Sequence, residues 1–402
     1  METTRTPTAL AEQLRAGEPV SILDVRDRDE FERWHVTGGA VTARQVPHVR
    51  FVAAEATGDP TESVPEALSE PIVVVCGRGE ASDQVAAMLR ERGLAAVNLA
   101  EGMDGFARVL LAADLPPTDD VATGTRPEHV RAETPEPDRV TIRQYQRPAS
   151  GCLSYLVAVG DEALVIDPLR AFTDRYADDA AALGATLRYA VDTHVHADHV
   201  SGVHALAGRT GARPVLPAGA RERGFASPDG TDFRFLEDGD TLSLDGTDLT
   251  TIHAPGHTHE HVALHGLGHL FSGDALFLTS VGRPDLEAGG GEAARELAGA
   301  AYETLHERLL TLPATTVLAP GHVAELSEGT DGRYTAPLAT VGELPILGLE
   351  RAAFVDRVAT ELPPRPSNYE EIVATNLGET ELDAAAAFEA ELGPNNCAVA
   401  GD

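Results

Sequence analysis

The sequence predicts two successive domains, the first of the α/β class with a parallel sheet, on three observations. Short apolar runs alternate with helical stretches over residues 1–115. Residues 116–138 are rich in proline, threonine and acidic side chains, which indicates a linker. Over residues 139–350 a new series of apolar runs follows, and most of them end in a histidine or an aspartate. With 402 residues and 43% hydrophobic content, the chain can bury more than one core.

We predict a parallel sheet for the first domain because its strands alternate with helices. The apolar runs are PVSILDVR, then EPIVVVC with the helical stretch SDQVAAMLRERG after it, then AAVNLAEG. Cys76 ends the second run, before a glycine-containing loop that leads into a helix near Ser82. The N–H groups of this loop, the positive end of the helix and Arg78 should favour the thiolate form of Cys76. Cys76 is therefore a candidate nucleophile.

The charge of the chain excludes a nucleic-acid-binding surface. The formal net charge is -33, spread along the chain, and every basic residue other than histidine is an arginine. Such self-repulsion destabilises a compact state in dilute salt, whereas concentrated salt screens it. We therefore expect a salt-accumulating, halophilic host.

The location we expect is the cytoplasm. The N-terminal residues contain no apolar segment after a basic start, and no run approaches the roughly 20 apolar residues of a membrane-spanning helix. The three cysteines, Cys76, Cys152 and Cys397, are far apart and odd in number, which fits a reducing compartment better than a disulfide scaffold. The apolar surroundings of Cys152 predict a buried core thiol, and the sequence decides nothing for Cys397.

The second domain contains the strongest local signal, the segment THVHADHVSG, with His194, His196, Asp198 and His199. Side chains two residues apart on an extended backbone point the same way, so His194 and His196 share a side. Asp198 and His199 follow at the entrance of a predicted helix. Four side chains that can bind a metal therefore converge in one short turn.

Three further candidate ligands follow, each beside a glycine: His257 in HAPGHT, Asp274 in FSGDALF and His322 in LAPGH. Glycine allows the tight turns and close backbone approach that an ion pocket at strand ends requires. We assign no role in the site to three other histidines and leave open an orienting role for three that flank His257. The former are His204, His265 and His306, and the latter are His253, His259 and His261.

This pattern resembles the metallo-β-lactamase superfamily, over about residues 143–350, which implies that the second domain is of the α+β class, an αββα sandwich with a metal site at one edge. Several stretches are similar to the persulfide dioxygenase branch: SGCLSYLV, THVHADHVSG, PGHT, SGDALF with VGRPDL, and LPPRPSNYEEIVATNLG. The last stretch belongs to a C-terminal extension, residues 351–402, that we expect to pack on the second domain.

The resemblance implies one Fe(II) per chain, bound by His194, His257 and Asp274, because two imidazoles and one carboxylate on one face leave positions for substrate and dioxygen. Arg283 matches the family position that binds the carboxylate of the thiol carrier. The remaining four candidates would hold these ligands in place or bind a second metal, and they are His196, Asp198, His199 and His322.

The first domain resembles the rhodanese superfamily over about residues 9–115. The stretches that carry the likeness are ILDVRDRDEFERWHVTGGAV, VVVCGRGEAS and LAEGMDGF. The resemblance implies that Cys76 carries a sulfane sulfur as a persulfide, with Arg78 in the sulfur-binding loop. Asp24 and Arg26 are expected to form a structural pair beneath this loop. Many active members have a second arginine where this chain has Ala81, so the activity of the domain is an open question.

Together the two resemblances imply an iron-dependent dioxygenase that oxidises a low-molecular-weight thiol persulfide to sulfite and thiol, in sulfur metabolism and sulfide detoxification. The partners would be the persulfide and dioxygen, without nucleic acid or membrane, and a homodimer is compatible with the sequence. Two alternatives stay open. One is a two-zinc thioester hydrolase of the glyoxalase II type, with Asp198, His199 and His322 on the second zinc and Asp274 as the bridge. The other is a non-enzymatic sulfur relay or sensor.

Overall fold

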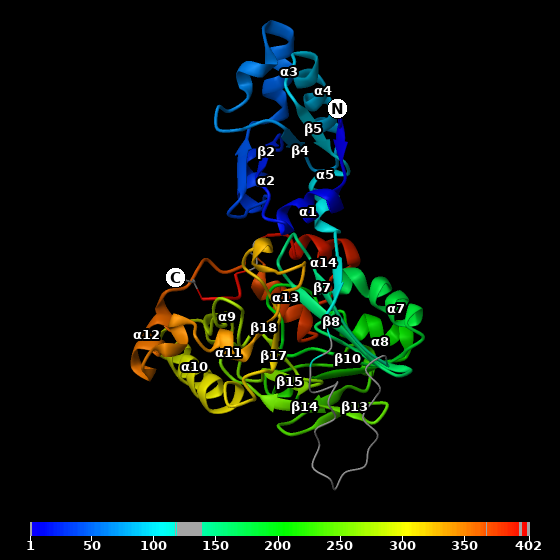
Figure 1. The fold of residues 1–402 in the computed structure, drawn as a ribbon, viewed down its shortest axis with the longest axis vertical. Helices are drawn as coiled ribbons and strands as arrows, with labels where there is room; N and C mark the ends of the chain where they lie inside the picture. Colours follow the sequence, from blue (N-terminus) through cyan, green and yellow to red (C-terminus); the bar gives the residue numbers. More distant parts are fainter. Residues whose placement is uncertain (1, 117, 119–138, 367, 394–395, 400–402) are drawn as a thin grey trace.

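The computed structural model describes residues 2–116, 118, 139–366, 368–393 and 396–399. These residues form a smaller N-terminal unit that stands on a larger C-terminal unit (Figure 1). The predicted linker, 116–138, lies outside the described residues except for positions 116 and 118. No helix of the described part is long and apolar enough to cross a membrane.

The N-terminal unit contains the parallel five-stranded sheet that the sequence predicts, in the order β1-β5-β4-β2-β3. Helices cover both faces, and for this reason all four residues of β4 are buried. The strands are β1 Thr4–Arg5, β2 Val20–Asp24, β3 Val41–Gln45, β4 Ile72–Val75 and β5 Ala96–Leu99. The helices are α1 Pro7–Arg15, α2 Arg28–Arg33, α3 His48–Thr57, η1 Pro60–Ser63, α4 Glu80–Glu91 and α5 Gly102–Ala107.

The next strand, β6 (Leu111–Asp114), belongs to the sheet of the other unit. It pairs antiparallel with β7 (Val140–Gln146) over its whole length. The sequence places these four residues in the first domain, because the apolar pattern of a strand does not reveal which sheet the strand joins.

The C-terminal unit is the predicted αββα sandwich (Figure 1). Its first sheet has the order β12-β11-β10-β9-β8-β7-β6 and its second the order β13-β14-β15-β16-β17-β18. The further strands of the first sheet are β8 Leu153–Val159, β9 Glu162–Ile166, β10 Thr186–Val191, β11 Arg213–Pro217 and β12 Arg234–Leu236. Those of the second sheet are β13 Thr241–Leu244, β14 Thr247–His253, β15 Val262–Gly266, β16 His269–Gly273, β17 Val317–Pro320 and β18 Ala336–Pro337.

Helices form the outer layers of this sandwich. The α-helices are α7 Thr173–Ala182, α8 Val203–Thr210, α9 Asp285–Ala288, α10 Gly291–Thr304, α11 Leu338–Val341, α12 Arg351–Thr360, α13 Tyr369–Asn376 and α14 Ala384–Ala390. The short 3₁₀ helices are η3 Arg170–Phe172, η4 Ala218–Arg221, η5 Pro228–Gly230, η7 Leu326–Glu328 and η8 Pro345–Gly348, and the π-helical segment η6 Leu305–Leu309 continues α10. Strand β8 shows how the layers divide, because alternate residues of a strand face opposite sides. Leu153 and Val157 enter the core between the sheets, whereas Leu156 packs under the helices of the first sheet.

The C-terminal extension packs on both units. Helix α12 lies against α10, and its Phe354 is fully buried in the outer core of the second sheet. Helix α14 instead brings Phe388 into the core of the N-terminal unit, beside Trp34 and Phe106. This extension therefore helps to join the two units.

A fully buried ion pair strengthens this junction. The Nη1 of Arg147 lies 2.6 Å from Oε2 of Glu391, and the two side chains are 0% and 1% exposed. The Nε–H of Arg147 also donates to the carbonyl of Ala107 in the N-terminal unit, at 3.1 Å. The guanidinium lies over the rings of Phe172 and Phe388, at 5.6 Å and 5.4 Å from the ring centroids.

We expect Arg147→Met to destabilise the protein by about 3–5 kcal/mol, because the carboxylate of Glu391 then stays buried without its partner. The measurement is urea unfolding followed by the fluorescence of Trp34, the only tryptophan of the chain. Arg295→Met is the control: this arginine pairs with Asp356 at the surface, where a pair contributes about 0–1 kcal/mol. The double variant with Glu391→Leu should regain most of the lost stability, because no buried carboxylate is then left without a partner. Equal urea midpoints for all variants would contradict the assignment of a stabilising buried ion pair.

Candidate metal centre

The candidate ligands meet where loops leave the ends of four strands. The segment 192–202 follows β10, His257 follows β14, Asp274 follows β16 and His322 follows β17. Since β10 belongs to the first sheet and the other three to the second, the site lies at an edge shared by both sheets. All seven residues that the sequence singles out are buried in this region.

His194, His257 and Asp274 form one compact group, with ligand atoms within 4.8 Å of one another. The Nε2 atoms of His194 and His257 lie 3.8 Å and 3.7 Å from Oδ2 of Asp274. All three atoms are buried, and none has a hydrogen-bond partner among the described residues. A buried polar atom without a partner costs free energy, and three that converge fit a shared cation with bonds of about 2.0–2.2 Å.

Hydrogen bonds fix the orientation of both imidazoles. The Nδ1–H of His257 donates to the carbonyl of Arg283 at 2.8 Å. The Nδ1 of His194 lies 3.0 Å from Oγ1 of Thr193, whose hydroxyl donates to Asp167. Burial lowers the pKa of both histidines, well below the usual value for His194. Each ring is therefore neutral, with the lone pair of Nε2 directed at the shared position, as metal binding requires.

His322 holds two carboxylates at once. Its Nδ1 lies 2.6 Å from Oδ1 of Asp274, and its Nε2 lies 3.0 Å from Oδ2 of Asp198. Burial opposes a charge on His322, but Asp274 and Asp198 outweigh it and raise the pKa of His322 well above its usual value. Burial likewise opposes ionisation of Asp274, but His322 lowers its pKa below the usual value. One oxygen of Asp274 is thus held by His322 while the other faces the shared position.

A second group, His196, Asp198 and His199, lies beside the first, again with ligand atoms within 4.8 Å. The Nε2 of His196 is 3.2 Å from Oδ1 of Asp167, and Nδ1 of His199 is 2.8 Å from Oδ2 of Asp198. Among the described residues, no candidate metal group combines Asp198, His199 and His322. His199 and His322 nevertheless contact the same Oδ2 of Asp198, at 2.8 Å and 3.0 Å.

Two cysteines that the sequence analysis does not place in the site lie next to it. The Sγ of Cys152 is 3.2 Å from Oδ2 of Asp198, and Cys397 forms a group with Asp274 and His322. Both are buried, Cys152 as predicted. Cys152 reaches the site because its backbone pairs with His322 in an antiparallel bridge. Nothing in the local sequence indicates this pairing.

Of the three histidines left open, only His261 contacts a candidate ligand. Its Nε2 accepts a hydrogen bond from the N–H of Asp274 at 3.1 Å, and burial lowers its pKa to about 3. His253 and His259 lie at the surface, where His259 pairs with Glu287.

The C-terminal extension holds the backbone of the loop that carries four of the candidates. The Nδ2 of Asn376 donates to the carbonyls of His196 and His199, both at 2.9 Å, and its Oδ1 accepts from the N–H of Ser201. The Oε1 of Glu391 accepts from the N–H of Val200 at 3.0 Å. Sequence reasoning missed both residues, because these contacts span about half of the chain.

We expect Asn376→Ala to weaken metal binding about 10–100-fold, as loss of a residue that orients metal ligands typically does. The loop would lose three hydrogen bonds to its backbone. Competition with a chelator measures the affinity. Thr375→Ala is the control, since the hydroxyl of Thr375 bonds to Glu371 and Thr380 and not to the loop. Equal affinities in the two variants would contradict a positioning role for Asn376.

Arg283 lies in a different environment from the one that its predicted role suggests. It is 1% exposed and makes two bonds to Asp285, from Nε at 2.7 Å and from Nη2 at 3.0 Å. Its Nη1 donates to the carbonyls of Pro364 and Asn396. The predicted contact with a substrate carboxylate stays a prediction, and the guanidinium that would make it is already paired.

The loop that follows β4 in the N-terminal unit encloses Cys76. The Sγ accepts hydrogen bonds from the N–H of Gly79 at 3.1 Å and from the hydroxyl of Ser82 at 3.2 Å. Arg78 is 82% exposed and lies 3.7 Å from Asp104. The donors at Cys76 therefore come from the loop and from the first turn of α4.

Asp24 and Arg26 form the ion pair that the sequence predicts, at 2.6 Å. Arg26 also donates to the carbonyl of Trp34, and the N–H of Val25 bonds to Val75 at the end of β4. The pair thus supports the strand that carries Cys76.

Comparison with known proteins identifies a family for each of the two units. The family model of the metallo-beta-lactamase superfamily matches residues 147–322, and that of the rhodanese-like domain matches residues 6–108. The mitochondrial persulfide dioxygenase ETHE1 of Bos taurus is 34% identical over 187 residues, which are 46% of this chain and 68% of that protein. A hydroxyacylglutathione hydrolase of Xanthomonas campestris is 31% identical over 247 residues, 59% of this chain and 86% of that protein.

Among solved structures, a metallo-beta-lactamase from Staphylococcus aureus superposes with a TM-score of 0.54 at 25% identity. The superposition covers 61% of this chain and 74% of that one. This likeness agrees with the αββα sandwich described above.

Proposed function

Because the chain belongs to the metallo-β-lactamase superfamily, in its persulfide dioxygenase branch, and carries a rhodanese-like domain in front, we propose that it is a persulfide dioxygenase. The reaction is R–S–SH + O₂ + H₂O → R–SH + SO₃²⁻ + 2 H⁺. The observation that carries the proposal is the group of His194, His257 and Asp274, whose three buried ligand atoms converge on one position. The relationship to the dioxygenase of Bos taurus supports it.

One Fe(II) per chain fits these residues. Two imidazoles and one carboxylate that bind from one side are the ligand set of non-haem iron oxygenases. When bound, iron would supply the positions at which a persulfide sulfur and dioxygen react.

The residues of the chain hold this ligand set and shield it. His322 fixes Asp274 so that one carboxylate oxygen faces the metal position, and Arg283 and Thr193 orient the two imidazoles through hydrogen bonds. The side chains around the position are almost completely buried, which limits access of water to the reactive sulfur species.

We propose that Cys76 of the rhodanese-like domain carries a sulfane sulfur. The N–H of Gly79 and the hydroxyl of Ser82 would stabilise the thiolate that leaves when sulfur is passed on. With sulfite as the acceptor, the persulfide anion of Cys76 gives thiosulfate and the free thiolate. Sulfite formed at the metal site would then be consumed at Cys76.

A two-zinc thioester hydrolase is the second candidate, supported by the likeness to the hydrolase of Xanthomonas campestris. It requires a second metal on Asp198, His199 and His322, which no candidate group of the described residues combines. The buried, converging group of His194, His257 and Asp274 supports the mononuclear site as the first candidate.

The two candidates differ in metal, substrate and product. Samples loaded anaerobically with iron or with zinc would be given a thiol persulfide in one assay and a glutathione thioester in the other. We expect the iron sample to consume oxygen and form sulfite with about one iron per chain. Thioester cleavage by the zinc sample, with two zincs per chain and no oxygen uptake, would favour the hydrolase.

We further propose a cytoplasmic enzyme of a salt-rich cell. The chain has 64 acidic and 31 basic residues, so repulsion between the excess negative charges opposes folding unless salt screens it. The free energy of unfolding, measured with urea, should rise by a few kcal/mol between about 0.1 M and 2 M potassium chloride. An unchanged or lower stability at 2 M would contradict the proposal.

A further inference from the structure

The peptide group that joins His199 to Val200, in the segment 192–202, is held from both sides. Its carbonyl accepts a hydrogen bond from Nδ2 of Asn376 at 2.9 Å, and its N–H donates to Oε1 of Glu391 at 3.0 Å. Val200 and Glu391 are both buried, which strengthens the bond between them. A peptide group bound on both sides is restrained in its rotation, and this fixes the direction in which the side chain of His199 leaves the backbone.

Asp198, directly before this peptide group, is connected to a candidate metal ligand. Its Oδ2 lies 3.0 Å from Nε2 of His322, and Nδ1 of the same imidazole lies 2.6 Å from Oδ1 of Asp274. All three side chains are buried. A shift of the backbone at Val200 would therefore reach the carboxylate of Asp274 through two hydrogen bonds.

The second oxygen of Glu391 is held by a residue that also contacts the N-terminal unit. Nη1 of Arg147 lies 2.6 Å from Oε2 of Glu391, and its Nε–H donates to the carbonyl of Ala107, the last residue of α5, at 3.1 Å. The backbone N–H of Arg147 donates to the carbonyl of Cys152 at 3.0 Å. The carboxylate that binds Val200 is thus fixed by a guanidinium that is itself fixed from the N-terminal unit.

The other end of α5 holds the segment that carries Cys76. The N–H of Met103 donates to the carbonyl of Cys76 at 2.8 Å, and that of Asp104 donates to the carbonyl of Gly77 at 2.9 Å. This helix of six residues therefore binds the Cys76 segment with its first turn and Arg147 with its last residue. The two candidate sites are joined by one series of hydrogen bonds.

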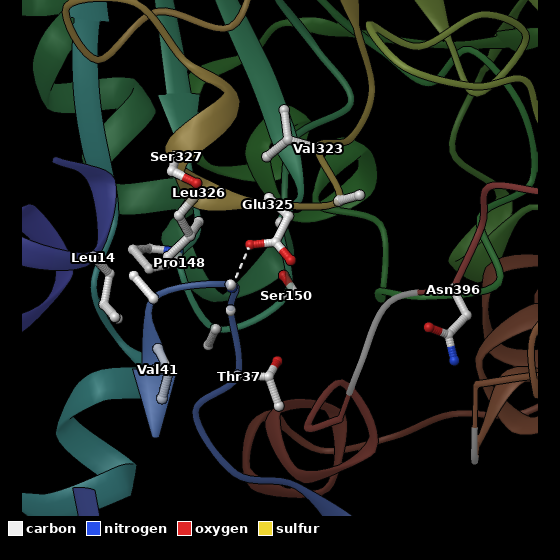
Figure 2. Close-up of a pocket in the computed structure, with 16 residues that line it drawn as sticks. Leu14, Thr37, Val41, Pro148, Ser150, Val323, Glu325, Leu326, Ser327 and Asn396 are labelled. Atoms are coloured by element: carbon white, nitrogen blue, oxygen red, sulfur yellow. Dashed lines mark hydrogen bonds between the residues drawn. The ribbon is translucent and has the colours of Figure 1, made fainter. Parts of the chain in front are cut away.

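The junction beside Arg147 is not packed throughout. A cavity of about 210 Å³ lies between the units, and its lining includes residues 37–41 of the N-terminal unit and residues 148–151, directly after Arg147 (Figure 2). A cavity contributes no dispersion contacts to the side chains around it. The position of Arg147 therefore depends on its own hydrogen bonds and on the rings of Phe172 and Phe388.

We propose that Arg147 and Glu391 are positioning residues of the metal centre, through which the N-terminal unit holds the segment 192–202 in its metal-binding conformation. The inference rests on the metal site of the proposed function, and it applies to either of the two reactions considered above. The N-terminal unit then has a role besides sulfur transfer, because it forms part of the scaffold of the metal site.

The test compares two double variants of the full-length protein that both remove the buried ion pair but differ at one hydrogen bond. In Arg147→Met/Glu391→Leu, the N–H of Val200 loses its acceptor. In Arg147→Met/Glu391→Gln, the introduced amide carbonyl can accept the same hydrogen bond. The leucine variant should be the more stable of the two, because a buried amide NH₂ group without an acceptor costs free energy.

Competition with a chelator measures the affinity of each variant for Zn(II) and, without oxygen, for Fe(II). We expect the leucine variant to bind either metal about 10–100-fold more weakly than the wild-type protein, and the glutamine variant to bind it within about threefold. Urea midpoints of the metal-free variants should show the opposite order, which a merely structural role would not produce. Equal affinities of the two variants, or affinities that follow the urea midpoints, would overturn the proposal.

Hydrogen exchange at the N–H of Val200 gives a readout without any metal. We expect this amide to exchange about tenfold faster in the leucine variant than in the glutamine variant, the size of one hydrogen bond to a strong acceptor. Equal exchange rates would overturn the positioning role of Glu391. If the protein oxidises no persulfide, the dioxygenase assignment fails, whereas zinc affinity and hydrogen exchange still decide this proposal.

A second pair of variants tests whether the N-terminal unit supplies the fixed position. Phe388, three residues before Glu391, packs in the core of the N-terminal unit with Trp34 and Phe106, whereas Phe354 is buried in the outer core of the second sheet. Phe388→Leu should weaken zinc binding about tenfold, because Glu391 loses its anchor in the N-terminal unit. Phe354→Leu removes the same volume from a buried ring and should leave the affinity within about threefold. Equal affinities of the two variants would overturn the role of the N-terminal unit.

Discussion

His257→Ala is expected to reduce iron affinity by at least about 10³-fold and to remove oxygen uptake with it. Loss of a residue that only orients a ligand costs about 10–100-fold, and His257 is itself a proposed ligand. Its Nε2 is one of three buried atoms that face a common position without a hydrogen-bond partner among the described residues. Removing it leaves His194 and Asp274 as two ligands. Iron content after gel filtration and oxygen consumption are the two measurements.

His204→Ala is the matched control for this change. This imidazole is 39% exposed and its partners lie near the surface, so iron content should stay at the wild-type value. Full iron content and oxygen uptake in His257→Ala would contradict the ligand assignment.

Cys76→Ser should reduce thiosulfate formation from sulfite by at least about 10³-fold, because the serine hydroxyl cannot carry a sulfane sulfur. Serine preserves the shape of the loop and can accept the same hydrogen bonds from Gly79 and Ser82. Oxygen uptake at the metal centre should therefore stay within about twofold of the wild-type value. Separate assays of oxygen, sulfite and thiosulfate distinguish the two sites.

Two outcomes would contradict this division of roles. Thiosulfate formation at the wild-type rate in Cys76→Ser would remove Cys76 from sulfur transfer. Loss of oxygen uptake in the same variant would show that the metal centre depends on the thiol.

The pattern of strands and helices predicted the parallel sheet, whereas the resemblance to a known family implied the sandwich and the group of His194, His257 and Asp274. These candidate ligands follow strand ends and stand in the short motifs on which that resemblance depends. The pair of Asp24 and Arg26 was accessible for the same reason, since its members are two residues apart.

Features that depend on contacts between residues far apart in the chain could not be predicted from the sequence. Asn376 in α13 and Glu391 directly after α14 bind the backbone of the segment 192–202, from 175 and 191 residues away in the chain. Their own surroundings in the sequence show only ordinary helical patterns. Cys152 is adjacent to the site because it pairs with His322, a bridge that joins two sheets.

Arg283 illustrates the limit of a motif in another way. The motif VGRPDL gives the position of the arginine, but it does not reveal that Asp285, two residues later, accepts two of its hydrogen bonds. Strand β6 is a similar case. Its apolar pattern predicts a strand but does not reveal that this strand pairs with β7.

The most direct test of the central claim is the ratio of oxygen consumed to sulfite formed by the full-length protein with one Fe(II) per chain. The assay uses a low-molecular-weight thiol persulfide in high salt, and the variant Cys76→Ser prevents loss of sulfite to thiosulfate. A dioxygenase predicts one sulfite per O₂, with both values falling to background in His257→Ala. Persulfide that disappears without oxygen uptake, or oxygen uptake without sulfite, would contradict the account.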